Sequence, residues 1–208
     1  MIHFILIRHG ETPWTKERRY QGSADTTLTK EGERQIKRFV TAVRRYDPDL
    51  IFSSSLKRAK QSANILAYPL GKRLKIDQRL NELSFGVWEG KTADELVQEN
   101  DPAFAQWIKG EIFTPEGGES IISFEKRVTS FINDCRKKHD NKKMIIVTHG
   151  GVIRMFIKVI LDLPVKNLFQ FRIDPGTITI LGDYQYTKQL IQINSQNPNK
   201  GIVPEGCI

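Results

Sequence analysis

The sequence has few cysteines and no long hydrophobic run. Its 208 residues include only Cys135 and Cys207, so we expect two free thiols in a reducing compartment rather than a disulfide framework. The apolar stretches Phe4–Ile7 and Met155–Leu161, the second interrupted by Lys158, are much shorter than the ~18–20 residues that span a membrane. The first residues lack the basic and apolar regions of a signal peptide. These absences predict a cytoplasmic protein without a membrane partner.

Metal-ligand spacings are missing as well. No two of the four histidines lie four residues apart, the cysteines are far from each other, and no paired-aspartate phosphatase motif occurs. Since motifs for metal sites place their ligands at short, regular spacings, we expect no metal ion and no other cofactor.

The net charge of +8 has two interpretations. It could indicate nucleic-acid binding, but the basic residues are scattered over several expected helices, and neither an aromatic RNA-binding strand nor a zinc-finger spacing occurs. A positive field would also attract a phosphorylated metabolite. We therefore expect a small phosphorylated molecule rather than nucleic acid as the partner, and a homodimer stays open.

Short apolar runs alternate with amphipathic segments along the chain. This alternation predicts an α/β fold, a three-layer α/β/α sandwich around a mostly parallel sheet. We expect a single domain over residues 1–208. The expected strands are 2–7, 49–52, 73–76, 144–148, 176–182 and 189–193, and the expected helices are 29–47, 56–66, 123–139 and 152–161. Thr29 and the serines 53–55 are expected to cap the first two helices.

Between these regular segments lies a stretch with weaker periodicity. Aromatic residues appear there among glycine, proline and acidic residues, which predicts a small helical cap inserted at about 83–122. The tail 194–208 is rich in Asn, Gly and Pro and is expected to be irregular. The aromatic residues of the cap stretch are Phe85, Trp88, Phe104, Trp107 and Phe113.

Two histidines follow the two most apolar strand candidates. The run 2–7 leads into His9 and the run 144–148 leads into His149, and a glycine follows each histidine. Parallel strands bring their carboxyl ends to one edge of a sheet, where ligands bind, so we expect the two imidazoles to face each other. The glycines allow the backbone to approach a ligand closely. One histidine after a strand is more often structural, so this interpretation depends on the pair.

Two arginines accompany the histidines. Arg8 precedes His9, and Arg58 begins the helix expected after the strand 49–52. Guanidinium groups fit phosphate oxygens bidentately, and two arginines and two histidines at one edge would repel one another without an anion between them. The simplest ligand for such an edge is a phosphoryl group.

A series of sequence blocks extends this pattern from residue 6 to residue 154. In this order the blocks resemble the motifs of the histidine phosphatase superfamily, also called the phosphoglycerate-mutase-like family. One Arg-His-Gly block alone is a weak signal, but the ordered series is specific. The blocks are Leu6–Thr12, Tyr20–Gly32, Phe52–Ala63, Leu80–Gly90, Gly117–Ser120 and Val147–Arg154.

The resemblance implies a catalytic role for five residues. His9 would attack phosphorus and become phosphohistidine, while Arg8, Arg58 and His149 would bind the phosphoryl oxygens. Glu82 would protonate the leaving oxygen and later deprotonate the attacking water. Covalent catalysis of this kind divides a very slow reaction into two steps.

Four more positions are implied as phosphate contacts. Gln21, Gly22 and the N–H group of Gly150 would line the phosphate site. Thr15 stands where the family often has asparagine, so we expect it to donate a single hydrogen bond in place of the amide.

Within the superfamily, the segments 80–89 and 171–176 are similar to those of α-ribazole phosphatases. This implies a metal-independent phosphomonoesterase, with α-ribazole 5'-phosphate of cobalamin nucleotide-loop assembly as the first candidate substrate. The segment 82–123 contains only Lys91 and Lys109 as basic residues, which favours water over a second phosphorylated acid as the phosphoryl acceptor.

Three alternatives remain at this stage. The first is a broad-specificity or other small-molecule phosphatase, and the second is a cofactor-dependent phosphoglycerate mutase, which would share the catalytic residues. The third is a non-catalytic module that binds phosphorylated ligands. The presence of all the implied catalytic residues argues against the third.

Overall fold

A six-stranded sheet forms the centre of the described molecule. The computed structural model describes residues 1–111 and 114–197. The strands lie in the order β3-β2-β4-β1-β5-β6. Strands β3, β2, β4 and β1 are parallel to one another, β5 is antiparallel to β1, and β6 is antiparallel to β5. The sheet is thus mostly parallel, as predicted. Its strands are β1 (Ile2–Arg8), β2 (Leu50–Ser53), β3 (Leu74–Ile76), β4 (Lys143–Thr148), β5 (Ile178–Asp183) and β6 (Lys188–Ser195).

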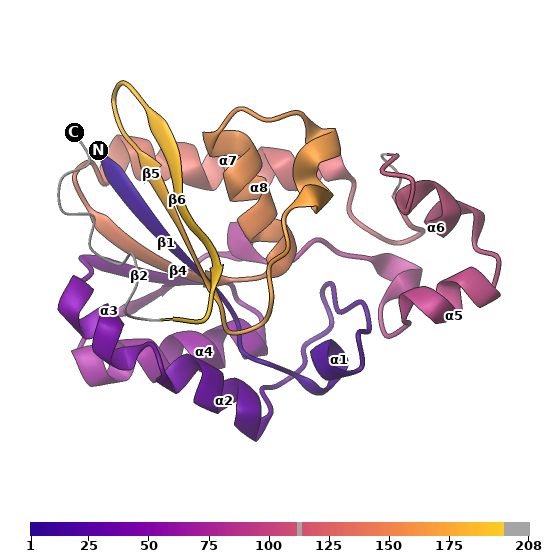
Figure 1. Ribbon diagram of the computed structural model, residues 1–208, viewed down its shortest axis with the longest axis horizontal. Coiled ribbons are helices and arrows are strands. Elements are labelled where there is room, and N and C mark those ends of the chain that lie inside the picture. The colour runs from indigo at the N-terminus through magenta and orange to yellow at the C-terminus, as the bar shows by residue number, and fades with distance from the viewer. Residues whose placement is uncertain (112–113, 198–208) are drawn as a thin grey trace.

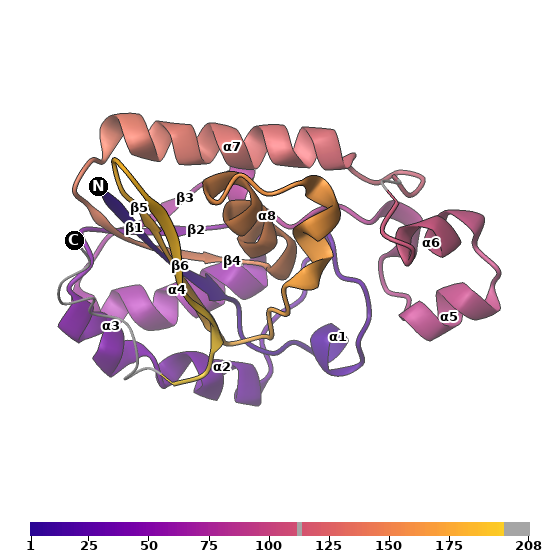
Figure 2. The same cartoon turned by 45° about the horizontal axis from the view of Figure 1, so that its top comes forward.

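Helices cover both faces of this sheet (Figures 1 and 2). The alternation of side chains along a buried strand explains why two covers are needed. Phe4 and Leu6 of β1 belong to one apolar core, and Ile5 and Ile7 belong to the other. The first core is covered by α7 (Ile121–Lys138) and α8 (Gly150–Ile160), and the second by α2 (Lys30–Lys37), α3 (Val40–Tyr46) and α4 (Lys57–Ala67).

The predicted helix over 29–47 is divided in two. Thr29 caps α2 as expected, because its side chain accepts a hydrogen bond from the N–H of Gly32. The N–H of Phe39 then bonds to the carbonyl of Ile36 at 3.0 Å. This tighter i→i+3 turn separates α2 from α3. Ile36 and Phe39 are both fully buried, so the predicted apolar face was right although the helix is not continuous.

The serine cap predicted for the next helix is wrong. The N-cap of α4 is Leu56, and no side chain caps it. The Ser54 hydroxyl accepts a hydrogen bond from the N–H of Leu56 at 3.2 Å instead. A further short helix, α1 (Pro13–Lys16), lies within residues 10–28, which the sequence indicated as loop.

Short helices form the predicted cap at one end of the molecule (Figure 1). Trp88 is fully buried there and its indole N–H donates to Asp101 at 3.0 Å. The ring of Tyr20, from the loop after β1, packs against Phe85 at 4.9 Å between centroids and so joins the cap to the body. Phe113 and the tail from residue 198 lie outside the described residues. The cap helices are η3 (Gly86–Trp88), α5 (Ala93–Gln98) and α6 (Pro102–Trp107).

The remaining short helices connect the layers, and they are η1 (Tyr68–Leu70), η2 (Gln78–Leu80) and η4 (Val165–Gln170). In the described part of the chain, no helix combines the length and apolarity needed to cross a membrane. Cys135 is a buried free cysteine on α7, and burial raises the pKa of its thiol to about 12. A thiol of this kind is unreactive.

Candidate active site

The ends of β1 and β4 place the two histidines side by side. The strands pair in parallel with Arg8 opposite Thr148, and the N–H of His9 bonds to the carbonyl of Thr148 at 2.9 Å. The chain leaves both strands at the same level, so the rings of His9 and His149 meet edge-on with 5.1 Å between their centroids. The predicted encounter of the two imidazoles is present.

A cavity of about 230 Å³ opens beside His9. Most of the predicted site residues lie in its wall, while His149 contacts this wall through the ring of His9. The predicted residues in the wall are Arg8, His9, Gln21, Gly22, Arg58, Glu82 and Gly150. They come from the end of β1, the loop after β1, the first turn of α4, the segment after η2 and the N-terminus of α8. Tertiary structure thus gathers residues that are up to 142 positions apart in sequence, from Arg8 to Gly150.

His9 is buried, with 2% of its surface exposed. Its Nδ1 lies 2.8 Å from the carbonyl oxygen of Gly10. A carbonyl can only accept, so Nδ1 carries the proton and Nε2 keeps its lone pair. Burial lowers the pKa of His9 well below its ordinary value, and the charges of Arg58 and Arg8 lower it further. The imidazole is therefore neutral near pH 7, which is the form that acts as a nucleophile.

His149 is fully buried beside His9. Its Nε2 lies 2.8 Å from the hydroxyl of Ser54, and its Nδ1 has no hydrogen-bond partner within the described residues. Burial lowers the pKa of His149 as well, and the charge of Arg58 lowers it further. The Ser54 hydroxyl gives its proton to the side-chain oxygen of Asn81, so Nε2 of His149 donates to Ser54 and Nδ1 keeps its lone pair as an acceptor.

The two arginines are held by backbone carbonyls. Arg8 donates from Nη1 to the carbonyl of Ile173 at 2.5 Å. Arg58 donates to the carbonyls of Ala24 at 2.5 Å and Gly22 at 2.7 Å. The Nε atoms of both arginines are buried and lack a partner in the described chain. These contacts fix both guanidinium groups and leave donor capacity unused.

Burial lowers the pKa of Arg8 to about 10 and that of Arg58 to about 10. In both cases the charge of Glu82 is the first cause that opposes the lowering. Both groups therefore stay positively charged near pH 7. Neither forms an ion pair with a described residue. Buried positive charge without a paired acid favours the binding of an anion.

Glu82 lies in the segment that follows η2. Its Oε1 accepts from the N–H of Leu83 at 3.0 Å, and its Oε2 accepts from the N–H of Gly151 at 3.1 Å. A Cβ atom at position 151 would lie 2.3 Å from Oε1. The carboxyl group can therefore approach α8 only because residue 151 is glycine.

Gln21 and Gly22 form another part of the wall. The side-chain oxygen of Gln21 accepts from Thr12 at 3.0 Å and Thr26 at 2.6 Å, which leaves its amide NH₂ group as a donor. Gly22 has a φ of +50°, and a Cβ atom there would lie 2.0 Å from Oε1 of Glu89. Glycine is required at this position for both reasons.

Thr15 is not in the cavity wall. Its hydroxyl accepts from the N–H of Thr12 at 2.8 Å and donates to the Thr12 carbonyl at 2.9 Å. Its N–H also donates to the Thr12 hydroxyl at 3.1 Å, which completes a capping box on α1. The hydroxyl for which we expected a phosphate contact therefore stabilises the N-terminus of α1.

Arg154 is a site residue to which the sequence interpretation gave no role. It lies in the cavity wall, four residues after Gly150 on the same face of α8. Its Nε donates to the carbonyl of Phe171 at 2.7 Å, and burial lowers its pKa. The i, i+4 spacing from Gly150 was the signal that could have identified it. Aromatic residues complete the wall, namely Tyr20, Phe85, Phe124 and Phe169.

Within residues 1–111 and 114–197, no group of three or more His, Cys, Asp or Glu residues lies close enough together to hold a metal ion. The charged and titratable groups in the wall of the cavity are arginines, His9, Tyr20 and the carboxyl group of Glu82.

Comparison with known proteins agrees with this geometry. The probable phosphoglycerate mutase GpmB of Escherichia coli O1:K1 / APEC is 35% identical over 187 residues, which cover 89% of this chain and 86% of that protein. The α-ribazole phosphatase from Shigella flexneri superposes with a TM-score of 0.84 at 30% identity, covering 93% of this chain and 96% of that chain. A mutant phosphoserine phosphatase from Entamoeba histolytica in complex with phosphoserine gives a TM-score of 0.85 at 30% identity, covering 96% and 100%.

Residues 4–196 match the sequence profile of the histidine phosphatase superfamily, branch 1. This match spans nearly all of the described chain and includes every predicted site residue. The protein belongs to the histidine phosphatase superfamily.

Proposed function

We propose that this protein is a phosphomonoesterase that transfers the phosphoryl group of its substrate to His9 and then to water. The observation that carries the proposal is the neutral, buried His9 beside Arg8 and Arg58, two guanidinium groups that have no ion-pair partner among the described residues. Fixed positive charge around the transferring group supplies most of the catalysis of phosphoryl transfer.

In the first step, Nε2 of His9 attacks phosphorus while the ester P–O bond breaks. The bond from Nδ1 to the Gly10 carbonyl holds the ring in the required tautomer. Arg8 and Arg58 neutralise charge on the non-bridging oxygens. Glu82 gives its proton to the departing oxygen, so the leaving group departs as an alcohol.

In the second step, a water molecule attacks the phosphohistidine and the P–N bond breaks. The carboxylate of Glu82 takes the proton from this water and returns to its acid form. The same group thus serves as acid and base in turn. Inorganic phosphate leaves, and His9 regains its neutral state.

Water is favoured as the acceptor because the cap offers few free cations. Lys91 is paired with Glu99 at 2.5 Å. Arg19, which reaches the cavity wall, is paired with Glu17 at 2.7 Å and Glu95 at 2.8 Å. A mutase must also bind a second phosphorylated acid, and Arg154 is the cavity arginine left for that purpose within the described residues.

For the substrate, we propose α-ribazole 5'-phosphate as the first candidate. Its ring system would find aromatic neighbours in Tyr20, Phe85 and Phe169. The likeness to an α-ribazole phosphatase structure supports this choice, and the likeness to a phosphoserine phosphatase supports a broader class of phosphate monoesters.

The test is a phosphate-release assay over α-ribazole 5'-phosphate, 3-phosphoglycerate, phosphoserine and sugar phosphates, with and without EDTA. We expect release that persists in EDTA and that is lost in His9→Ala. Wild-type turnover in His9→Ala would end the proposal. Phosphoryl transfer to 2-phosphoglycerate or 3-phosphoglycerate in place of phosphate release would identify a mutase.

A further inference from the structure

Arg127 on α7 binds the backbone that carries Glu82. We call residues 79–84 the acid loop. The guanidinium group of Arg127 donates from Nη1 to the carbonyls of Arg79 at 2.7 Å and Asn81 at 2.6 Å, and from Nη2 to the carbonyl of Glu82 at 3.0 Å. One side chain thus satisfies three carbonyls of a segment that is not fully covered by secondary structure.

Glu119 completes this arrangement. Its carboxylate accepts from Nε and from Nη2 of Arg127, each at 2.7 Å, which is the bidentate geometry of a strong pair. The side chains of both residues are only 20% exposed. The N–H of Glu119 donates to the carbonyl of Ser84 at 3.0 Å. Glu119 therefore orients Arg127 and also holds the far end of the acid loop.

This contact gives a role to the sequence block Gly117–Ser120, which no catalytic step uses. A Cβ atom on Gly118 would lie 2.9 Å from the carbonyl oxygen of Ser84. A Cβ atom on Gly86 would lie 2.0 Å from the carbonyl oxygen of Glu116. The glycines let the two segments run in contact, so Glu119 reaches the acid loop.

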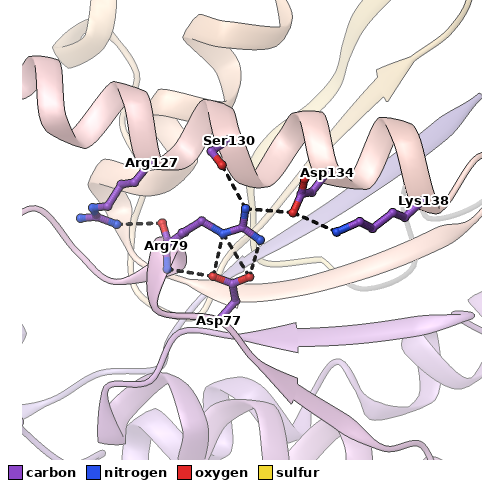
Figure 3. Close-up of polar contacts among 6 residues, drawn as sticks. All are labelled: Asp77, Arg79, Arg127, Ser130, Asp134 and Lys138. Atoms are coloured by element: carbon purple, nitrogen blue, oxygen red, sulfur yellow. Dashed lines mark hydrogen bonds and ion pairs between the residues drawn. The ribbon is translucent and has the colours of Figure 1, made fainter.

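A second arginine fixes the near end of the loop to the same helix (Figure 3). The guanidinium group of Arg79 bonds to Asp77 at 2.7 Å, to Ser130 at 3.1 Å and to Asp134 at 3.1 Å. Figure 3 shows this cluster along α7, with Arg127 bonded to the carbonyl of Arg79. The loop is thus fastened to α7 by its own side chain at one end and by Arg127 along its length.

The opposite side of the loop is connected to His149 through Ser54. The side-chain oxygen of Asn81 accepts from the hydroxyl of Ser54 and from the N–H of Ser55, each at 2.9 Å. The Ser54 hydroxyl also contacts His149. Glu82 then projects from a backbone fixed on two sides. Among the described residues, its carboxyl group accepts hydrogen bonds from the backbone N–H groups of Leu83 and of Gly151 on α8.

We propose that the Glu119–Arg127 pair is a positioning device for Glu82. The pair sets the position of the Glu82 carboxyl group relative to the leaving oxygen of the substrate. Neither Glu119 nor Arg127 lies in the cavity wall. The inference rests on the proposed phosphatase function. Arg127 acts through Glu82, so its removal should impair proton transfer and spare phosphate binding. A shift of about 1 Å in a catalytic group can cost ~10²-fold in rate.

The test compares two leaving groups in Arg127→Met. Nitrophenolate departs from p-nitrophenyl phosphate without needing a proton, whereas the alkoxide from an alkyl phosphate such as phosphoserine needs one. kcat/KM reports the first chemical step for both substrates. We expect a loss on the order of tenfold to a hundredfold for the alkyl phosphate, and less than about threefold for p-nitrophenyl phosphate, with an unchanged inhibition constant for inorganic phosphate.

Arg136→Met is the matched control. Arg136 lies on the same helix and pairs with Asp183 at 2.7 Å, but makes no bond to the acid loop. It should leave the ratio of the two kcat/KM values at the wild-type level. Glu82→Gln gives the reference ratio for loss of the acid itself, and Arg127→Met should add little to the loss in the Glu82→Gln background, because both changes remove the same step.

The outcomes separate the two proposals. If Glu82→Gln lowers kcat/KM for both substrates equally, the assigned acid is wrong and the proposed mechanism fails. If Glu82→Gln is selective for the alkyl phosphate but Arg127→Met is not, only the positioning inference fails. If Arg127→Met does not fold, Glu119→Gln takes its place, with the same selective loss expected at a smaller size and an unselective or absent loss overturning the inference.

Discussion

At the scale of single residues, the site holds positive charge that is largely removed from solvent. Arg58 is fully buried and Arg8 faces the same cavity, while His9 and His149 stay neutral because protonation would add a further charge there. The arrangement of these charges therefore favours an anion. The burial of these groups also has a measurable effect on the stability of the protein.

One cost is a loss of stability in mild acid. The pKa values of His9 and His149 are lowered in the folded protein, by burial first and by the charge of Arg58 next, whereas the unfolded chain has the ordinary value of about 6.5. Below that pH the unfolded state binds more protons, so the free energy of unfolding falls as the pH falls. The slope reaches about 1.4 kcal/mol per pH unit for each histidine.

Denaturant unfolding between about pH 8 and pH 5, in buffer without phosphate, measures this slope. The contribution of both histidines should be fully present above about pH 7 and decline below it. His149→Gln should flatten the profile by the share of one group. An equal slope in the wild type and in His149→Gln would contradict the conclusion that His149 is a buried, neutral imidazole.

A substitution at Gly151 should lower the activity without lowering the stability of the protein. Gly151→Ala places a Cβ atom where Oε1 of Glu82 now lies, 2.3 Å away, so the carboxyl group must move. Alanine is also the better helix former by about 1 kcal/mol. We expect kcat/KM for an alkyl phosphate to fall by roughly tenfold or more, without loss of thermal stability. Retained activity would show that Glu82 does not need its present position.

At the scale of elements, the cap depends on one aromatic cluster. Trp88 of η3 lies at its centre, with ring centroids 5.4 Å from Phe104 and 5.8 Å from Trp107 of α6. Trp107 in turn meets Phe169 of η4 at 4.6 Å. The aromatic rings therefore join the cap to the segment that follows α8, where Phe169 belongs to the cavity wall.

Trp88→Ala should remove this centre. Truncation of a buried tryptophan costs about 3–5 kcal/mol, and the hydrogen bond to Asp101 is lost with it. We expect a lower denaturation midpoint together with a raised KM, because η3 directly follows Phe85 of the cavity wall. Val97→Ala on α5, at a residue that is 56% exposed, is the control and should change stability by less than about 0.5 kcal/mol. Equal effects of the two changes would refute the role given to the cluster.

At the scale of the whole molecule, an oxyanion should act as a structural ligand. It would relieve the repulsion between Arg8, Arg58 and Arg154, which reach one cavity from β1, α4 and α8. At a concentration of 100 times its Kd, orthovanadate should add about 2.7 kcal/mol to stability. For a chain of this size that corresponds to an increase in Tm of roughly 5–10 °C.

A thermal melt with and without orthovanadate measures the effect. Arg58→Met should abolish the increase, since it removes a buried charge and the donors that face the anion. Chloride at equal ionic strength serves as the control for nonspecific screening. An increase of the same size in Arg58→Met would place the anion somewhere else.

The sequence by itself determined the strands and most of the long helices, because their signals are local. It did not reveal the break between α2 and α3 or the short helix α1. An apolar run such as 2–7 can only be buried, and the histidine after it then falls at a sheet edge. The ordered blocks around Arg8, Arg58, Glu82 and His149 also identified the family before any coordinates. The tail beyond residue 197 and Phe113 lie outside the described residues, so the expectations for them stay predictions.

Tertiary structure decided which of these residues meet and which do not. Thr15 carries a hydroxyl suited to phosphate, but the capping box with Thr12 uses it, and no local pattern reveals a competing partner. Arg127 has the pattern of an ordinary surface charge, because its targets are backbone carbonyls 45 and more residues away. Glu119 has no role visible in the sequence, because it acts through its pair with Arg127. Local patterns encode what each segment becomes, whereas the pairing of a side chain with a distant carbonyl depends on packing that only the folded chain possesses.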